Sequence, residues 1–298
     1  MLGKIRCRLV CLHRDAKNKV SQTARTFAGR ASAKAIHAFA LCSFCLLTAC
    51  SGQKNIIVVA GSTSVQPYAE VLAEDYILLH PGSEIDIQGG GSSAGITAVR
   101  SGAADIGMSS RELSEKESDL WSVEIAKDGL AVIVHPSNPI NNLSLEQIRD
   151  IYSAVVTSWS ELGGNHSEIH IISREDGSGT RSAFDSLVMD PAEISPRAII
   201  QDSNGTVRFL VSDDPNAIGF ISLGLVDDTV KAVDISGVAA TQENVSDGSY
   251  SLYRPFLFVL AEPPEGEAKR FIDFVLSGEG KQILTDEGLV TLTEEMSQ

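Results

Sequence analysis

Cysteine is missing from most of this sequence. All five cysteines, Cys7, Cys11, Cys42, Cys45 and Cys50, fall within the first fifty residues of a 298-residue chain. No disulfide can therefore form within residues 51–298, even in an oxidising compartment. Internal repeats and low-complexity tracts are also absent. The composition is that of an ordinary globular protein with one large or two mid-sized domains.

Positive charge is scarce beyond residue 49. Nine of the 24 Lys and Arg residues lie in residues 1–49, whereas only one of the 39 acidic residues, Asp15, lies there. The rest of the chain therefore has 15 basic and 38 acidic residues, a formal net charge of −23. Because such a body repels DNA, RNA and anionic lipid, we expect no nucleic-acid partner.

The N-terminal apolar stretch is too short for a permanent membrane span. The run "AIHAFALCSFCLLTAC" at 35–50 follows a basic segment and suits a signal-peptide core, whereas a buried core helix would not follow so many cations. The run ends in Leu47-Thr48-Ala49-Cys50, which resembles the lipobox of bacterial lipoproteins. We therefore expect a signal peptide at 1–49, lipidation of Cys50 and a tether at 50–55. The protein would then be lipid-anchored to a membrane, in the periplasm or at the cell surface.

Strand-like and helix-like patterns alternate through the rest of the chain, which favours parallel α/β layers. Ser144 and Gln147 have the spacing of a capping box at the start of one helix. The expected strands are 55–61, 84–91, 105–111, 129–139, 168–173, 216–226 and 250–260, and the expected helices are 64–82, 94–104, 144–153, 179–188 and a pair within 267–290. We expect two α/β lobes, with one crossing near "HPSNP" and a return near "YRPFLF".

Three strand-to-helix turns are rich in hydroxyls and glycine: "GSTSVQP" at 61–67, "GGGSSAG" at 89–95 and "REDGSGTRS" at 174–182. A fourth, "GMSSR" at 107–111, also ends a strand. The first N–H groups of a helix lack intrahelical partners and carry partial positive charge, so such turns suit an anion. Ser and Thr are also common N-cap residues, so capping alone could explain the hydroxyls of one such turn. It is a poorer explanation for four such turns in one chain. Ligands of open α/β sheets bind beyond the carboxyl ends of strands, where all four lie.

A body this acidic has to recognise an anion through local groups. Arg174 is the expected cation, since its planar fork suits a tetrahedral oxyanion. The alternative for Arg174 is an ion pair with Glu175 or Asp176.

These turns carry a family resemblance. The segments "AGSTSVQP", "GGGSSAGITAVRSGAADIGMSSREL", "LAVIVHPSNPINNLSLEQIRDIYS", "WSELGG", "ISREDGSGTRSAF" and "NAIGFISLG" resemble, in order and spacing, the phosphate-binding proteins of bacterial phosphate ABC transporters. The resemblance implies a two-lobed periplasmic binding-protein fold of type II, with two interlobe crossovers and the ligand in the cleft. Lobe I would comprise 56–134 and 254–298, and lobe II 135–253. It also implies a non-enzymatic receptor that needs no cofactor and delivers inorganic phosphate to an inner-membrane ABC permease.

Matched motif by motif, the resemblance implies a set of phosphate-binding residues. They are Thr63 and Ser64, Ser92 and Ser93 (with Ser93 as the donor hydroxyl), Ser110, and Arg174, Ser178, Gly179 and Thr180. Ser110 is a departure from the family pattern. At this position the family has an aspartate, whose implied role is to accept the proton of hydrogenphosphate. Asp176 is an alternative acceptor, or caps its own turn. Arg111 is a second cation, or pairs with Glu112 or Glu115. Sulfate and molybdate therefore stay open as ligands.

We considered four other functions beside that of an anion receptor. Gly89, Gly91 and Ala94 fit a dinucleotide-binding pattern, but not on the first strand. A serine hydrolase would need a G-x-S-x-G elbow, which "DGSGT" does not match. His166 and His170 have the spacing of half a zinc site but straddle a loop and a strand, so we expect no metal. A scaffold or adhesin would show no saturable oxyanion affinity.

Overall fold

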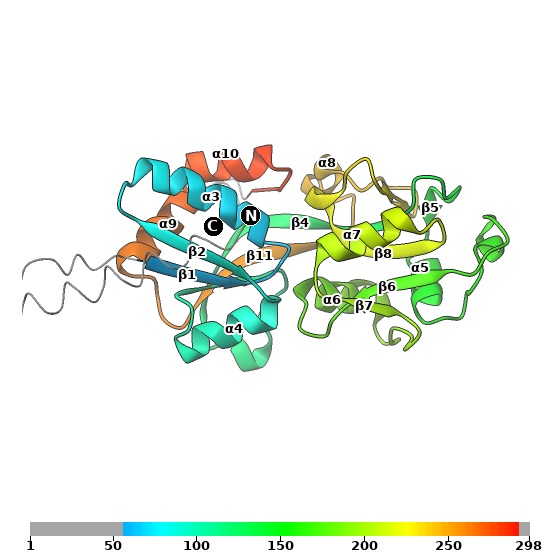
Figure 1. Ribbon diagram of the computed structural model, residues 1–298, viewed down its shortest axis with the longest axis horizontal. Coiled ribbons are helices and arrows are strands. Elements are labelled where there is room, and N and C mark those ends of the chain that lie inside the picture. The colour runs from blue at the N-terminus through cyan, green and yellow to red at the C-terminus, as the bar shows by residue number, and fades with distance from the viewer. Residues whose placement is uncertain (1–55, 292–298) are drawn as a thin grey trace, which may run out of the picture. The chain divides into compact units, whose positions relative to one another are not determined.

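A nine-stranded mixed sheet runs through the part of the chain that the computed structural model describes, residues 56–291 (Figure 1). The strand order is β2-β1-β3-β11-β4-β8-β6-β7, with β9 paired to β4. The strands are β1 (Ile56–Gly61), β2 (Glu84–Gly89), β3 (Ile106–Ser109), β4 (Trp121–Val134), β6 (His170–Arg174), β7 (Ile199–Gln201), β8 (Ala217–Ser222), β9 (Lys231–Ala232) and β11 (Tyr253–Leu260). A second sheet pairs β5 (Asn142–Leu143) with β10 (Asp234–Ile235). The predicted signal peptide, Cys50 and the tether lie outside the described residues.

Lobe I is built on strands β1, β2 and β3, which pair in parallel. Side chains of β1 alternate between its two faces, as expected of a strand. Ile57 and Val59 pack with α3 (Gln66–Leu79), α9 (Gly266–Leu276) and α10 (Gly278–Asp286), whereas Val58 and Ala60 pack with Val99 of α4 (Ser92–Ser101). Figure 1 shows α3, α9 and α10 on one side of this sheet and α4 on the other.

Lobe II divides its core between the two faces of β4 and β8. Leu130 and Phe220 pack with α5 (Leu145–Tyr152), α6 (Gly179–Phe184), α8 (Gln242–Ser246) and the π-helix η4 (Asp185–Met189). Ala131 and Ile221 pack on the opposite face, with Val207 of α7 (Asn204–Asp213). This mixed part of the sheet is therefore covered by helices on both faces.

The strands β4 and β11 pass from one lobe to the other. In β4, Ala126 belongs to the core of lobe I and Leu130 to that of lobe II. At β11, Leu252 belongs to lobe II and Phe256 to lobe I. Two lobes joined by two crossings confirm the predicted architecture. The first crossing strand was predicted only from Gly129, but it begins at Trp121, where half-buried polar residues interrupt the apolar pattern.

The start of helix α5 was predicted correctly from the sequence. The Ser144 hydroxyl accepts from the Gln147 backbone N–H, and the Gln147 side chain accepts in return from the Ser144 N–H, so the predicted capping box at α5 is confirmed. Among the helices within 56–291, none is both long enough and apolar enough to cross a bilayer.

Candidate functional site

The four hydroxyl-rich turns meet at the carboxyl ends of strands from both lobes. In lobe I, the parallel pairing of β1 with β2 and β3 brings their ends to one sheet edge. In lobe II, β6 lies parallel to β7 and β8 and leads through Arg174 into the turn before α6. The structure thus brings together residues that are more than a hundred positions apart.

The lobe I part of the site is a cluster of fully buried serines. The Ser62 hydroxyl donates to Ser110 Oγ at 2.8 Å, and the Ser110 N–H donates to Ser92 Oγ at 3.0 Å. The oxygens of Ser92 and Ser110 lie 3.4 Å apart. Since none of these hydroxyls reaches solvent, each needs partners inside the protein.

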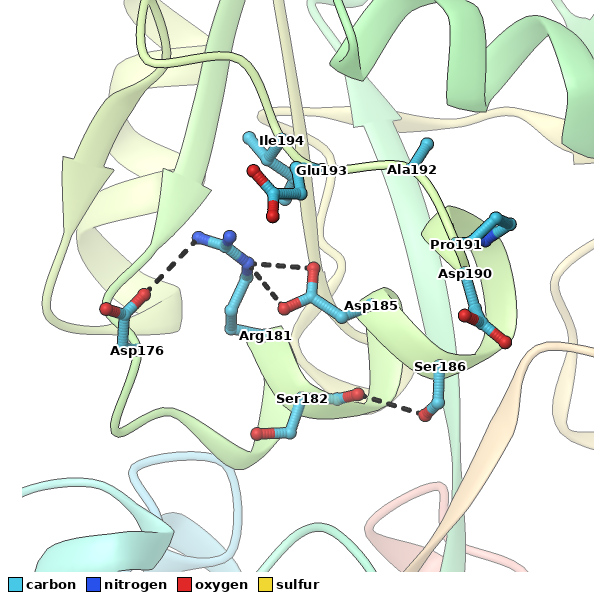
Figure 2. A pocket seen from close by; sticks show the side chains of 10 residues that line it. All are labelled: Asp176, Arg181, Ser182, Asp185, Ser186, Asp190, Pro191, Ala192, Glu193 and Ile194. Atoms are coloured by element: carbon cyan, nitrogen blue, oxygen red, sulfur yellow. Dashed lines mark hydrogen bonds and ion pairs between the residues drawn. The ribbon is translucent and has the colours of Figure 1, made fainter.

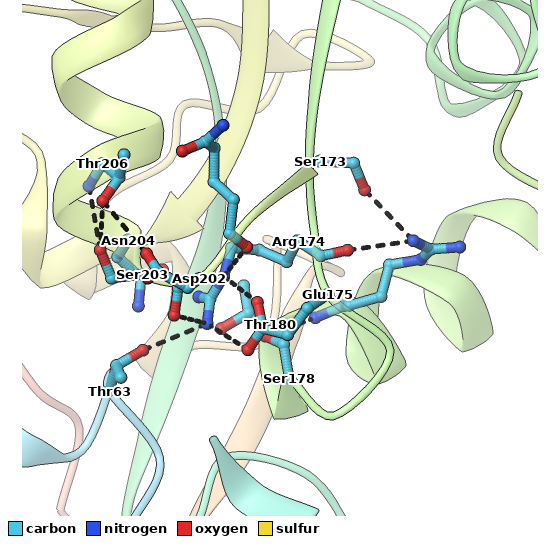
Figure 3. Close-up of polar contacts among 12 residues, drawn as sticks. Thr63, Ser173, Arg174, Glu175, Ser178, Thr180, Asp202, Ser203, Asn204 and Thr206 are labelled. Atoms are coloured by element: carbon cyan, nitrogen blue, oxygen red, sulfur yellow. Dashed lines mark hydrogen bonds and ion pairs between the residues drawn. The ribbon is translucent and has the colours of Figure 1, made fainter. Parts of the chain in front are cut away.

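Hydrogen bonds join this cluster to lobe II. The hydroxyls of Ser64 and Thr180 lie 2.8 Å apart, and the Ser93 N–H donates to the Gly177 carbonyl at 3.2 Å. Arg174 Nη2 donates to Thr63 Oγ1 at 3.2 Å, as Figure 3 shows. The two lobes are therefore in contact around the site.

Gly179 lies where the backbone of lobe II comes close to the serines of lobe I. A Cβ at this position would collide with the hydroxyls of Ser92 and Ser110, on the opposite lobe. Only glycine lets the α6 turn come this near to the serine cluster. Gly177, two residues earlier, is different. A Cβ added there would have Ser93 Cβ as its nearest atom, at 4.0 Å, so it would fit without a collision.

Arg174 is a buried cation of the site, with 1% of its surface exposed. Its Nε and Nη2 each lie 3.0 Å from a carboxylate oxygen of Glu175, and Nη2 also donates to the Asp202 carbonyl (Figure 3). Its Nη1 is buried and has no hydrogen-bond partner. The ion pair with Glu175 is therefore confirmed, while the role of Arg174 as the cation for an anion stays a prediction, for which Nη1 is the available nitrogen.

The hydroxyls at the site share one polarity. Each oxygen already accepts a hydrogen bond from a protein donor, which leaves its proton to be donated elsewhere. Between Ser92 and Ser110, one hydroxyl donates to the other at 3.4 Å. The acceptor–donor pairs are Thr63 with Arg174 Nη2, Ser92 with the Ser110 N–H, Ser110 with the Ser62 hydroxyl, and Ser178 with the Arg181 N–H. Buried donors grouped around an arginine favour an anion with several acceptor oxygens.

Comparison with known proteins agrees with this geometry. A model of the PBP superfamily domain matches residues 48–279. The phosphate-binding protein PstS of Bacillus subtilis is 33% identical over 244 residues, which cover 80% of this chain and 81% of that protein. The chain belongs to the PstS family of the PBP superfamily.

Solved structures of PstS-like proteins agree in fold. A Clostridium perfringens structure, described as a phosphate ABC transporter substrate-binding protein with bound phosphate, is 45% identical and superposes with a TM-score of 0.78, over 80% of this chain and all of that one. An ABC-type phosphate transport receptor from Vibrio cholerae is 38% identical with a TM-score of 0.68, over 79% of this chain and 100% of its own. These matches confirm the two-lobed binding-protein fold expected from the sequence.

At the α4 end of the site, the expected role of Ser93 as donor in this PstS family member stays a prediction, whereas the expected partners of Arg111 need correction. Ser92, and not Ser93, is the fully buried hydroxyl next to Ser110, while Ser93 is half-buried and lies 3.4 Å from Arg111 Nη2. Arg111 pairs with neither acid that the sequence suggested. Its two terminal nitrogens donate to Glu117 at 2.8 and 2.9 Å, and these bonds are the main cause that lowers the pKa of Glu117 to about 2.

Asp176 does not join the other predicted residues. Its carboxylate is fully exposed and lies 4.0 Å from Arg181 Nη1, at the edge of an open hollow of about 770 Å³ (Figure 2). The carboxylates of Asp176, Asp185, Asp190 and Glu193 line this acidic hollow. The turn that brings Gly179 inward turns Asp176 outward, so it supplies no acceptor to the buried serines.

Sequence reasoning missed Arg254 and Asp128, a fully buried ion pair on the two crossing strands. The two residues face each other in the β4–β11 register, and Arg254 donates to one Asp128 oxygen through Nε at 3.1 Å and Nη2 at 2.9 Å. Burial raises the pKa of Asp128, against the opposing effect of Arg254. A charged residue within an apolar strand such as "YSLYRPFLFVL" signals a buried partner, but the sequence does not say which.

Asn204, at the start of α7, was also missed. Its Nδ2 donates to Ser64 Oγ at 2.8 Å across the lobes, and its Oδ1 accepts from the Ser222 N–H at 3.3 Å. His166 and His170, considered as half a zinc site, instead contact Ser160 and Asp214. No three His, Cys, Asp or Glu side chains within 56–291 are grouped as metal ligands would be.

Proposed function

We propose that this protein captures inorganic phosphate outside the cytoplasm and delivers it to an ABC transporter. The relatives named above are called phosphate-binding protein, phosphate transport receptor and phosphate ABC transporter substrate-binding protein, and one was solved with phosphate bound. Such a protein is a receptor and not an enzyme. Its function requires tight, reversible binding and no covalent step.

The observation that carries the proposal is the free Nη1 of Arg174. A buried guanidinium N–H without a partner costs about 1–3 kcal/mol or more, because it has lost water and gained nothing. A phosphate oxygen in hydrogen-bond reach would remove that cost and would place the anion among hydroxyls that can donate to it. Charge-assisted bonds of this kind are roughly twice as strong as neutral ones.

We propose that donors from both lobes contact the phosphate directly. They are Thr63, Ser92 and Ser110 from lobe I, and Arg174, Ser178, Gly179 and Thr180 from lobe II. Ser64, Ser93 and Arg111 then hold these donors in place through the contacts described above. The N-terminal amides of α4 add partial positive charge on the same side.

We propose that the lobes move about the two crossing strands. The change of core between Ala126 and Leu130, and between Leu252 and Phe256, supports hinges at these points. The first hinge would then precede the boundary expected at 134. Closure over phosphate would exclude water and present both lobes to an inner-membrane permease.

We propose that lipidation of Cys50 anchors the protein to a membrane. The support is the lipobox-like Leu47-Thr48-Ala49-Cys50 after a basic, apolar leader. In cells fed a labelled fatty acid, the wild-type protein should carry label and Cys50→Ala should not, with Cys50→Ala also lost from the membrane fraction. Equal membrane retention of both proteins would contradict the anchor.

The function is tested by calorimetric titration of the purified protein with phosphate, arsenate, sulfate and molybdate. Saturable one-to-one phosphate binding is expected. Tighter binding of sulfate or molybdate would identify a receptor for a different oxyanion. No binding of any oxyanion would point to a scaffold and end the receptor proposal.

A further inference from the structure

The hydroxyl of Ser64, in lobe I, has three hydrogen-bond partners, and none of them belongs to the cluster of Ser62, Ser92 and Ser110. Its Oγ lies 2.8 Å from Asn204 Nδ2, 3.2 Å from Arg254 Nη2 and 2.8 Å from Thr180 Oγ1. All four residues are at most 2% exposed. Bulk water therefore does not replace any of these partners, and the direction of each hydrogen bond matters.

Two of the three bonds have a fixed direction. Arg254 can only donate, and Asp128 holds its guanidinium in place. The amide of Asn204 is oriented by the Ser222 N–H, which can only donate and therefore faces Oδ1. Asn204 Nδ2 then faces Ser64 as a donor. The side-chain orientation follows from a backbone group whose role is not in doubt.

A serine oxygen accepts two hydrogen bonds and donates one. With both lone pairs of Ser64 filled by Asn204 and Arg254, its proton has one remaining destination, Thr180 Oγ1. Thr180 accepts this bond, and its own proton is left for a ligand. The arrangement is complete only when lobe II, which carries Asn204 and Thr180, lies against Ser64.

We propose that Asn204 and Arg254 are positioning residues: they commit Ser64 to donate to Thr180, and thereby commit Thr180 to donate to the bound anion. This inference rests on the proposed phosphate site but makes a separate claim, about proton direction. Asn204 is the residue to test, because removing Arg254 would leave the Asp128 charge buried without its partner and would destabilise the fold.

The substitution Asn204→Asp keeps the side chain's shape and replaces the donor with an acceptor. Ser64 would then donate to the aspartate, Thr180 would donate to Ser64, and a Thr180 lone pair would face the anion. We expect a phosphate Kd at least about 100-fold weaker. Asn204→Ala should cost less, roughly threefold to tenfold, because Arg254 still fills one lone pair. Asn165→Asp adds the same charge at an exposed position of lobe II and should change the Kd less than about twofold.

A double-mutant cycle with Ser64→Ala separates proton direction from through-space repulsion. Without the Ser64 hydroxyl there is no relay, so Asn204→Asp should cost only about tenfold in that background, against about 100-fold in the wild type. Equal costs in both backgrounds would overturn the inference while leaving the phosphate site intact. A wild-type protein that does not bind phosphate would instead overturn the site and the inference together.

Thermal unfolding and circular dichroism show whether each variant is folded. If Asn204→Asp does not fold, a second pair of variants carries the test. Thr180→Ser keeps the hydroxyl and should bind phosphate within about threefold of wild type, whereas Thr180→Val should lose roughly 100-fold. In Thr180→Val, the added cost of Asn204→Ala should vanish, and persistence of that cost would contradict the relay.

Discussion

Arg174 and Arg181 belong to the same turn-and-helix segment of lobe II, yet their surroundings differ in kind. Arg174 is 1% exposed, is paired with one carboxylate, and has a buried nitrogen that no protein group satisfies. Arg181 faces the acidic hollow, where Asp185 binds it at 2.9 Å and Asp176 approaches (Figure 2). Of these two arginines, only Arg174 combines burial with a nitrogen that its carboxylate partner leaves free.

The largest expected effect on phosphate affinity comes from substituting Arg174 and not Arg181. Arg174→Ala removes the buried charge and leaves Glu175 without its partner, so phosphate affinity should fall by at least about 100-fold. Arg181→Ala removes an arginine from the same segment and should cost less than about tenfold. Calorimetry on both variants decides the matter, and a loss at Arg181 equal to that at Arg174 would contradict the distinction.

A smaller effect tests the contact between lobes. Gly179→Ala introduces a Cβ into the hydroxyls of Ser92 and Ser110, which opposes the approach of the lobes and should weaken phosphate binding roughly 10- to 100-fold. Gly177→Ala, where the nearest atom would be 4.0 Å from the new Cβ, is the matched control and should stay within about threefold. Indistinguishable affinities of the two variants would show that this approach is not needed for binding.

The smallest effect concerns the ion pair between Arg111 and Glu117, which lies outside the cluster of buried serines. The pKa of Glu117 is lowered from 4.5 to about 2, so the stability it contributes is present above about pH 4.5 and is lost as the pH falls toward 2. Glu117→Gln should lower the free energy of unfolding by about 1 kcal/mol at pH 7. Denaturant unfolding should show this difference shrinking toward pH 2, and a difference that does not vary with pH would refute the assignment.

Features that depend on neighbouring residues were predictable from the sequence. The Ser144–Gln147 capping box, the terminal helix pair and the hydroxyl-rich turns at strand ends all follow from short-range spacing. The convergence of Thr63 and Ser92 was also predictable, because the carboxyl ends of the parallel strands β1 and β2 share an edge. Arg174 follows β6 of lobe II and reaches Thr63 only because the two lobes face each other.

Features that depend on long-range register were not predictable. Arg254 meets Asp128 because β11 pairs antiparallel with β4 in one register, and no local pattern in either strand encodes that partner. Asn204 was missed because the α7 sequence, with Gly205 and β-branched Thr206 in its first turn, has low helix propensity and is stabilised by packing on β8. The buried polar network around Ser64 therefore became visible only in three dimensions.

The central claim is that one phosphate sits between the lobes, bound by the free nitrogen of Arg174. The most direct test is a crystal structure of the purified protein grown with phosphate. The account predicts a single anion within hydrogen-bond distance of Arg174 Nη1, Ser92 Oγ and Thr180 Oγ1, with Asn204 still bonded to Ser64. An anion bound elsewhere, for example against Arg181 in the acidic hollow, with none beside Arg174, would contradict it.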